Sequence, residues 1–372
     1  MNELSQVEKI LKRYLPENLA NLFNRACINA EITRLSRITK LDKTNVEIWS
    51  ACRPKAFMWQ VSAGKGFTKK QAIITAIMEA LEGYVCESYL NSYPLDVTIN
   101  PANPISLIHL KSESKKLLGV TPIINKEEIT WIKAREIKSG EDVYVPLYWA
   151  YLSNNASKFG MVTNGLSGGL NNKSAIRHGI CELIERHYIS SIFEKGAANK
   201  NVVKKINIRS VITLLEQSLN FQDENLFCIN FIVITTSKVP TIWCIIFDES
   251  PLSPNLSVNF GSKSSISLED AVIGSFTEAC QQRASQIQGV REDLSDHIAI
   301  PCSAKVKRLK DFINSLQSVC IDDLEYNSNC DPLEGLPGPI YQIPIFSKLS
   351  HIENIFFYKH VAPKATFKQG LF

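Results

Sequence analysis

The sequence predicts an α+β fold in which capped helices recur among β-strands. A helical pattern with a polar first residue occurs three times, over residues 68–82, 171–185 and 267–281. Runs rich in β-branched and aromatic residues stand between the copies, as at residues 227–235 and 241–247. The spacing of these runs is irregular, which argues against a doubly wound parallel sheet. We therefore expect one α+β domain with internal repetition.

The composition is typical of a globular protein and excludes several function classes. Hydrophobic residues make up 45% of the 372 residues and charged residues 21%. The net charge of +4 is too small to indicate a nucleic-acid or membrane surface. No signal peptide and no membrane-spanning run is evident, so we expect a cytoplasmic protein. The ten cysteines include no Cys-x-x-Cys pair, which favours reduced thiols over a zinc site.

The elements outside the repeated helices follow from local patterns. Residues 1–30 read as a helical segment that Pro16 divides, and residues 31–372 as the main domain. Expected strands cover residues 32–39 and 46–52. Further strands are expected at 130–134, 143–147, 227–235, 241–247 and 340–345, further helices at 210–218 and 305–315, and an irregular tail after residue 345.

The repeated helices carry acidic residues in matching places. Aligned on Ala72, Ala175 and Ala271, each copy has Glu seven residues later and Glu or Gln three residues beyond that. Two side chains three apart share one helix face. These positions are Glu79 and Glu82, Glu182 and Glu185, and Glu278 and Gln281.

Apolar neighbours predict that these helices are mostly buried. A buried carboxylate cluster without a cation would cost more than the net stability of a domain. We therefore expect Mg²⁺ there, which binds a few carboxylates together with nucleotide phosphates. The alternative is that the acids lie on solvated helix faces, because Glu is a good helix former.

Two glycine-containing segments precede the first two helices. Gly64-Lys65-Gly66 combines flexible backbone with a cation before a helix start, which suits a phosphate, although the Walker A spacing is absent. Residues 163–169 have three glycines and could form an anion-accepting nest. The alternative for Lys65 is an ordinary turn lysine.

Two further residues of the second helix are candidates. His178 lies one turn before Glu182, where it suits either a ligand contact or a structural hydrogen bond. Arg186 can balance the neighbouring acids or a phosphate.

Five motifs in order resemble those of the YcaO family and cover residues 31–293. They are Thr33-Arg-Leu-Ser-Arg-Ile-Thr-Lys-Leu-Asp; Ala51-Cys-Arg-Pro; Ser62-Ala-Gly-Lys-Gly with Thr75-x-x-x-Glu79-x-x-Glu82; Asn164-Gly-Leu-Ser-Gly-Gly with Glu182-Leu-Ile-Glu-Arg; and Phe276-Thr-Glu-Ala-Cys-Gln-Gln-Arg with Arg291-Glu-Asp.

The resemblance implies a single YcaO-type domain around an ATP and Mg²⁺ site. It implies an enzyme that uses ATP to phosphorylate a backbone amide oxygen of a ribosomally made peptide or protein. A nucleophile then adds to the amide carbon and phosphate leaves. A Cys, Ser or Thr side chain gives an azoline by cyclodehydration, a sulfide equivalent gives a thioamide, and an amine gives an amidine.

The resemblance also assigns site residues by motif position, to which the Gly-Lys-Gly pattern adds Lys65; His178 stands where the family often has Gln or His. Expected ATP-binding residues are Lys65, Thr75, Glu79, His178, Glu182, Arg186 and Glu278. Expected Mg²⁺ ligands are Glu79, Glu82, Glu182, Glu185 and Glu278. No catalytic residue is assigned beyond these.

Two positions depart from the family pattern and define an alternative. Gly83 stands where the first motif usually has Arg, and Gly274 stands where the third motif usually has Arg. Fewer cations near a triphosphate would weaken its binding. A catalytically reduced subunit that binds a peptide or a partner protein is the alternative, followed by an unrelated hydrolase with an acidic metal site.

The resemblance implies partners as well. We expect a peptide or protein substrate and a leader-binding or sulfur-handling partner of the TfuA type, with no nucleic acid and no membrane. A homodimer is left open. The C-terminus, Lys368-Gln-Gly-Leu-Phe372, lacks the proline-rich ending of many azoline-forming members, which favours the other branches.

Overall fold

The computed structural model shows two compact units. The first comprises residues 1–80 and 192–330, and the second comprises residues 81–191 and 331–371. The structure describes residues 5–57, 59–87, 97–99, 101–106, 129–151, 163–195, 202–219, 227–249, 257–289, 303–327, 330–345 and 354–365.

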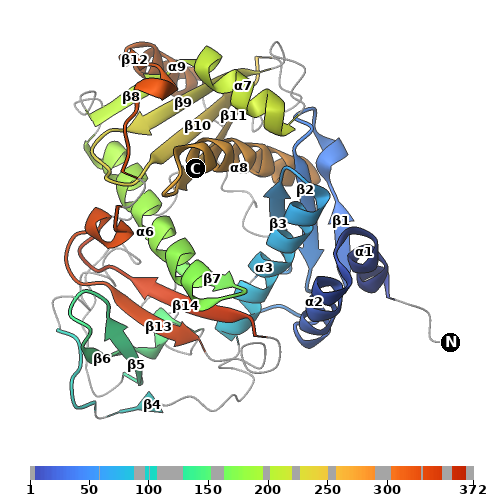
Figure 1. Ribbon diagram of the computed structural model, residues 1–372, viewed down its shortest axis with the longest axis vertical. Helices are drawn as coiled ribbons and strands as arrows, with labels where there is room; N and C mark the ends of the chain where they lie inside the picture. The colour runs from blue at the N-terminus through green and yellow to red at the C-terminus, as the bar shows by residue number, and fades with distance from the viewer. Residues whose placement is uncertain are drawn as a thin grey trace. The chain divides into compact units, whose positions relative to one another are not determined.

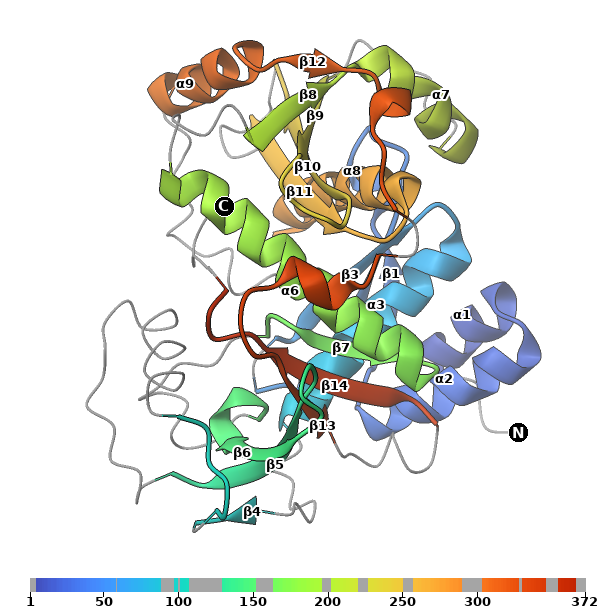
Figure 2. The same cartoon turned by 60° about the vertical axis from the view of Figure 1, so that its left-hand side comes forward.

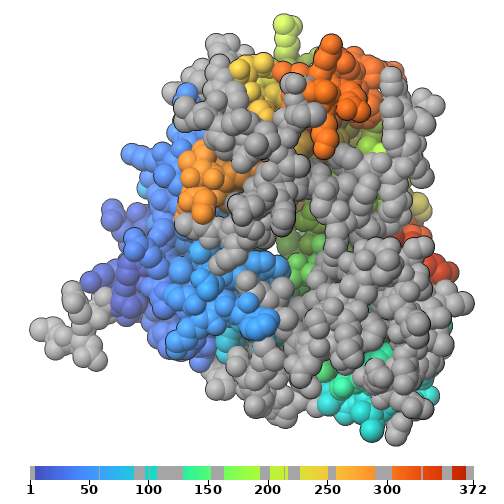
Figure 3. Space-filling view, turned by 180° about the vertical axis from the view of Figure 1, so that it is seen from behind, coloured from blue at the N-terminus to red at the C-terminus, as the bar shows by residue number. Residues whose placement is uncertain are grey.

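The first unit begins with two helices, as predicted. α1 (Gln6–Tyr14) starts after Ser5, whose side chain accepts a hydrogen bond from the Glu8 amide, and α2 (Glu17–Asn29) starts directly after Pro16. The Gln6 side chain donates to the Leu35 carbonyl and accepts from the Leu35 amide. These two bonds attach α1 to the first strand. In the space-filling view, the blue N-terminal segments of this unit form one contiguous surface (Figure 3).

A three-stranded antiparallel sheet and the first repeated helix follow. The strands are β1 (Arg34–Arg37), β2 (Glu47–Cys52) and β3 (Val61–Gly66), with the 3₁₀ turn η1 (Thr39–Leu41) after β1. α3 (Lys69–Glu87) comes next. Thr68 Oγ1 accepts from the Gln71 amide at 3.2 Å and Gln71 Oε1 accepts from the Thr68 amide at 3.2 Å, which is a capping box.

A five-stranded sheet in the order β11-β10-β9-β8-β12 completes the first unit. Its neighbours are antiparallel except for the β12–β8 pair, in agreement with the prediction against a doubly wound sheet. α8 lies on one side of this sheet, and α7 and α9 lie on the other (Figures 1 and 2). The elements are β8 (Val203–Ile206), α7 (Ile208–Leu219), β9 (Cys228–Ile234), β10 (Thr241–Phe247), β11 (Val258–Ser264), α8 (Leu268–Gln288), α9 (Ser303–Asn314), β12 (Ser318–Val319) and η8 (Ile321–Asp323).

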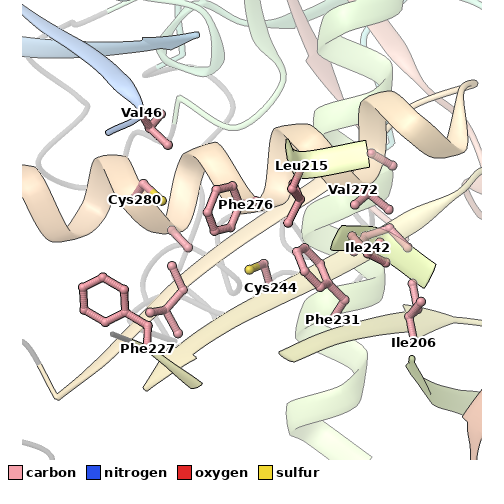
Figure 4. Close-up of a cluster of buried hydrophobic side chains, with 14 of the residues drawn as sticks. Val46, Ile206, Leu215, Phe227, Phe231, Ile242, Cys244, Val272, Phe276 and Cys280 are labelled. Carbon is pink, nitrogen blue, oxygen red and sulfur yellow. The ribbon is translucent and has the colours of Figure 1, made fainter. Parts of the chain in front are cut away.

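The hydrophobic core of this unit lies between α8 and the sheet. Every residue of β10 is buried, which explains its uninterrupted apolar sequence. Phe276 and Val272 point from α8 toward the strands that carry Phe231 and Ile242 (Figure 4). The ring centroids of Phe231 and Phe276 are 6.3 Å apart. Burial of these apolar faces holds the third repeated helix in place.

The second unit is built on a sheet of order β4-β5-β13-β14-β7, with β6 paired to β5. α6, the second repeated helix, begins after Asn171, whose side chain accepts from the Ser174 amide at 2.8 Å. The elements are β4 (Val97–Thr98), β5 (Trp131–Glu136), β6 (Asp142–Pro146), η4 (Leu147–Trp149), β7 (Leu166–Gly169), α6 (Asn172–Lys195), η9 (Pro332–Gly335), β13 (Tyr341–Ile345) and β14 (Phe356–Val361).

The prediction of an irregular tail is wrong for β14. This strand lies between β13 and β7 and pairs antiparallel with both. Its polar residues Lys359 and His360 are buried, so its sequence lacks the apolar alternation that identifies a strand. The tail residues 366–372 lie outside the described part of the chain.

No helix among the described residues is long and apolar enough to cross a membrane. The nine cysteines that the structure describes are free thiols, as predicted. Burial raises the pKa of Cys27 to about 12, so this thiol is unreactive at neutral pH.

Candidate functional site

Each repeated helix packs directly on the backbone of the strand before it. A Cβ atom added to Gly64 of β3 would lie 2.0 Å from the Ala76 amide nitrogen of α3. A Cβ added to Gly261 of β11 would lie 2.1 Å from the Ser275 carbonyl oxygen of α8. In the second copy the helix supplies the glycine, since a Cβ on Gly179 would lie 2.6 Å from Ser167 Oγ of β7. Small residues therefore allow each strand and helix to touch, one turn before the first acidic position.

This packing corrects the interpretation of Gly64-Lys65-Gly66 as a phosphate loop. These residues end strand β3, and both glycines face α3. Successive side chains of a strand point to opposite faces, so Lys65 points away from α3. Its Nζ atom lies 2.9 Å from Glu278 Oε2 of α8. The glycines thus serve helix packing, while the lysine between them reaches a predicted site residue.

The predicted residues of the first unit gather around the end of β3. Thr75 Oγ1 donates to the Lys65 carbonyl at 2.8 Å, and Gln281 Nε2 donates to the Ala63 carbonyl at 2.6 Å. Glu79 lies one turn after Thr75 on α3 and is exposed. Lys65, Thr75 and Glu278 are therefore directly or closely connected in this unit.

The predicted residues of the second unit surround the glycine-rich turn before α6. Glu182 Oε2 accepts a hydrogen bond from the Gly165 amide at 3.0 Å. Glu82 Oε1, near the end of α3, accepts from the Gly168 amide at 2.7 Å. The amides predicted to form an anion nest thus donate to carboxylates of the protein itself. The turn orients two predicted metal ligands instead of binding an anion through these two amides.

Arg186 lies beside both acids of α6. Its Nε atom is 3.9 Å from Glu182 Oε1 and 3.8 Å from Glu185 Oε1. Glu185 is buried, so the guanidinium offsets part of the cost of burying that charge. His178 is exposed on the same helix, one turn before Glu182.

Burial of the five acids is less uniform than the sequence predicts. Glu185 is buried, Glu82, Glu182 and Glu278 are partly buried, and Glu79 is exposed. The apolar residues of the helices form the buried faces, and the acids lie at their margins. Desolvation alone therefore does not require a cation at four of the five positions.

The donor set nevertheless fits a metal–nucleotide complex. Each carboxylate has two oxygens, and fixing one by a hydrogen bond orients the other for a ligand. Among the described residues, no three His, Cys, Asp or Glu side chains form a ready metal cage. Mg²⁺ commonly uses one or two carboxylates together with substrate phosphates, so a nucleotide would supply the missing ligands.

Some residues near these groups carry no recognisable sequence signal. Lys359 and His360 contact the Asn164–Gly165 turn from β14, 195 positions away in the chain. Only contacts across the sheet reveal them. The fifth family motif, Arg291-Glu-Asp293, lies outside the described residues.

Comparison with known proteins decides the family. The family model described as YcaO cyclodehydratase, ATP- and Mg²⁺-binding, matches residues 63–326. The chain belongs to the YcaO family. The predicted cofactors, ATP and Mg²⁺, are those of the YcaO family, and the predicted family is confirmed.

Two curated relatives share part of this sequence. An uncharacterized protein of Methanothermobacter thermautotrophicus is 33% identical over 269 residues, which cover 70% of this chain and 68% of the relative. A protein encoded in the tfuA 3′ region of Rhizobium leguminosarum bv. trifolii is 28% identical over 165 residues, which cover 42% of this chain and 37% of the relative.

Two solved structures confirm the α+β fold of the YcaO chain. YcaO from Methanopyrus kandleri bound with AMPPCP and Mg²⁺ has a TM-score of 0.67 at 18% identity, covering 94% of this chain and 91% of the other. A chain of the Escherichia coli microcin synthetase McbBCD complex with bound pro-MccB17 has a TM-score of 0.62 at 16% identity. The match covers 90% of this chain and 88% of the other.

Proposed function

We propose that this YcaO-family chain uses ATP and Mg²⁺ to activate a backbone amide of a ribosomally made peptide or protein. The amide oxygen takes the γ-phosphoryl group, with ADP as the other product. A nucleophile adds to the amide carbon, and phosphate leaves with the former amide oxygen. An internal Cys, Ser or Thr nucleophile gives an azoline, and an external sulfide equivalent gives a thioamide.

The observation that carries this proposal is the ion pair of Lys65 and Glu278, at 2.9 Å. It joins the lysine before the first repeated helix, which the sequence pattern suits to a phosphate, to an acid of the third, which the family resemblance places at ATP. Phosphoryl transfer depends mainly on positioning and on charge stabilisation. Lys65 would bind phosphate oxygens, and the paired acids would hold the Mg²⁺ ion that neutralises the developing charge.

The remaining site assignments are part of the same proposal. We assign ATP contacts to Lys65, Thr75, Glu79, His178, Glu182, Arg186 and Glu278, and Mg²⁺ contacts to Glu79, Glu82, Glu182, Glu185 and Glu278. The hydrogen bonds from the Gly165 and Gly168 amides support the assignments of Glu182 and Glu82, because bound metals generally require oriented carboxylates.

The comparisons support both product classes and one kind of partner. A heterocyclase in complex with substrate and cofactor shares the fold, with a TM-score of 0.67 at 14% identity and coverage of 93% of this chain and 52% of the other, which supports azoline formation. The Rhizobium relative is encoded beside tfuA, which supports a TfuA-like partner and thioamide formation. Mass spectrometry of a modified peptide distinguishes loss of water from exchange of oxygen for sulfur.

The environment of Gly274 bears on the alternative of a catalytically reduced subunit. A Cβ added to Gly274 would lie 2.7 Å from Lys263 Cγ and 3.3 Å from Lys263 Cδ. The stem of a lysine from β11 therefore covers the position where the family usually has arginine. This contact favours the enzyme, because Lys263 of β11 brings a cation-bearing side chain against the helix that carries Glu278.

A thermal-shift titration with ATP and MgCl₂ tests the proposed function. Ligands that bind the native state raise its melting temperature by mass action. We expect a Mg²⁺-dependent rise for the wild type, its loss in Glu182→Gln, and its retention in the control Glu216→Gln, which changes an exposed acid of α7. No rise in the wild type would favour the binding subunit.

A further inference from the structure

The glycine-rich turn before α6 is held by two buried polar residues that the proposed function does not use. Lys359 and His360 are adjacent on β14, where Lys359 pairs with Leu166 of β7. Their exposed fractions are 5% and 0%. Lysine is rarely buried so completely, because its charge must leave water. Its presence here indicates a role for the ammonium group.

Both residues bind the backbone of the turn. Lys359 Nζ donates to the Asn164 carbonyl at 2.5 Å. The His360 amide donates to the Gly165 carbonyl at 2.8 Å, and His360 Nδ1 lies 3.2 Å from the same oxygen. Burial lowers the pKa of His360 to about 4, so the ring is neutral at pH 7. A carbonyl can only accept, so the ring proton is on Nδ1.

The backbone conformation of the Asn164–Gly165 turn allows these contacts. Gly165 has φ +79°, a left-handed conformation that favours glycine. A Cβ at this position would lie 2.3 Å from the His360 carbonyl oxygen. A Cβ on Gly179 of α6 would lie 2.5 Å from His360 Nδ1. The imidazole thus fills the space between the helix and the turn, where two glycines make room for it.

The same turn also binds Glu182, one of the predicted Mg²⁺ ligands. The Gly165 carbonyl accepts hydrogen bonds from His360. The Gly165 amide donates to Glu182 Oε2 at 3.0 Å. A tilt of the Asn164–Gly165 peptide or of Gly165 itself would change the direction of that donor. A continuous series of hydrogen bonds therefore runs from β14 through the turn to the Glu182 carboxylate.

We propose that Lys359 and His360 are positioning residues that set the orientation of Glu182 for the metal–nucleotide complex. This inference rests on the proposed function, because it concerns the same carboxylate. Both residues bind the Asn164–Gly165 turn, whose Gly165 amide donates to the Glu182 carboxylate, and we expect them to act through this turn. Loosening the turn should mainly change the Mg²⁺ requirement for nucleotide binding.

The test measures the Mg²⁺ concentration that gives half of the thermal shift produced by a non-hydrolysable ATP analogue. Lys359→Met removes the ammonium at similar length, and His360→Phe removes the ring donor while keeping a ring. His360→Asn retains a donor near the position of Nδ1. Tyr358→Phe is the control on the same strand, because it removes the 2.9 Å hydrogen bond from Tyr358 to Asn172.

We expect Lys359→Met and His360→Phe to raise this Mg²⁺ concentration about tenfold, the scale of the loss when a group that orients a metal ligand is removed. For His360→Asn and Tyr358→Phe, the Mg²⁺ concentration that gives half of the thermal shift should stay close to the wild-type value. Each shift compares one variant with and without nucleotide, so a lower starting melting temperature does not obscure it. If either Lys359→Met or His360→Phe does not fold, the other still decides the result.

The outcomes separate this inference from the proposed function. Folded Lys359→Met or His360→Phe protein with the wild-type Mg²⁺ requirement would overturn the inference and leave the proposed function standing. An equal rise of the required Mg²⁺ concentration in His360→Asn and His360→Phe would overturn the role of the ring donor. A wild type without any Mg²⁺-dependent shift would overturn both the proposed function and this inference.

Discussion

Lys65 of β3 and Glu278 of α8 form a 2.9 Å ion pair although 213 positions separate them in the chain. Both side chains are about one quarter exposed, at 26% and 27%. The pair arises because Gly64 and Gly66 face α3 and leave the intervening lysine to point toward α8. It connects the first and third repeated motifs within one unit.

Replacing this lysine should affect nucleotide binding more than folding. A partly exposed ion pair contributes at most about 1 kcal/mol to the free energy of unfolding. We therefore expect Lys65→Met to melt near the wild type but to show a much smaller rise with ATP and MgCl₂. Lys70→Met, at an exposed position of α3, serves as the control. An undiminished ATP response in Lys65→Met would contradict the assignment of Lys65 to phosphate.

Gly64→Ala should destabilise the first unit. The new methyl group would lie 2.0 Å from the Ala76 amide nitrogen, so strand and helix must separate. Overpacking of this kind costs about 1–3 kcal/mol or more. Urea unfolding measures the loss directly.

Gly274→Ala is the matched control for that substitution. Its methyl group would meet the flexible Lys263 stem, which can move, and alanine is the better helix former by about 1 kcal/mol. Its free energy of unfolding should stay within about 1 kcal/mol of the wild type. Equal losses in the two variants would show that close strand–helix contact is not what Gly64 provides.

Arg283 should be a strong determinant of stability. Its guanidinium lies 2.9 Å from Asp42 Oδ1 and 2.8 Å from Asp248 Oδ2, and it stacks 4.7 Å from the Phe227 ring centroid. All three charged side chains are at most 9% exposed. Arg283→Met would leave two buried carboxylates without this cation, at a cost of about 3–5 kcal/mol.

An exposed ion pair of equal length provides the comparison for Arg283. Lys55 Nζ lies 2.9 Å from Glu31 Oε1, with both side chains more than half exposed. Water and salt screen such a pair, so Lys55→Met should unfold at the wild-type urea concentration. A similar stability for Arg283→Met and Lys55→Met would argue against a structural role of the buried network.

His360 should make stability depend on pH. Burial, with a smaller contribution from the neighbouring Lys359 charge, lowers its pKa from 6.5 to about 4 in the folded protein. Between these values the unfolded chain binds more protons, so stability rises with pH. The contribution is complete above pH 6.5, and about 3 kcal/mol of it is lost as the pH falls toward 4.

Urea unfolding of wild type and His360→Asn across pH 4–7 tests this effect. The asparagine does not titrate, so the stability difference between wild type and variant should shrink as the pH falls. Parallel pH profiles for the two proteins would show that His360 is not a buried neutral residue.

Much of the local structure follows from the sequence alone. The caps Thr68, Asn171 and Ser267 and the starts of the three helices are confirmed, because capping depends on residues within one turn. β10 occupies the predicted residues 241–247, since an apolar run bounded by turns has few alternatives. β14 could not be predicted in the same way, because its buried Lys359 and His360 bind the backbone of the Asn164–Gly165 turn, 195 positions away in the chain.

The candidate site shows the same division. The sequence by itself determined the matching acids of the three helices, because identical spacing on helices places side chains on equivalent faces. It could not determine what each acid touches. Only the tertiary structure decided that Glu278 meets Lys65, that Glu182 and Glu82 accept backbone amides, and that Lys359 and His360 hold the turn. Those contacts join residues far apart in the chain, and burial of the whole apolar surface brings them together.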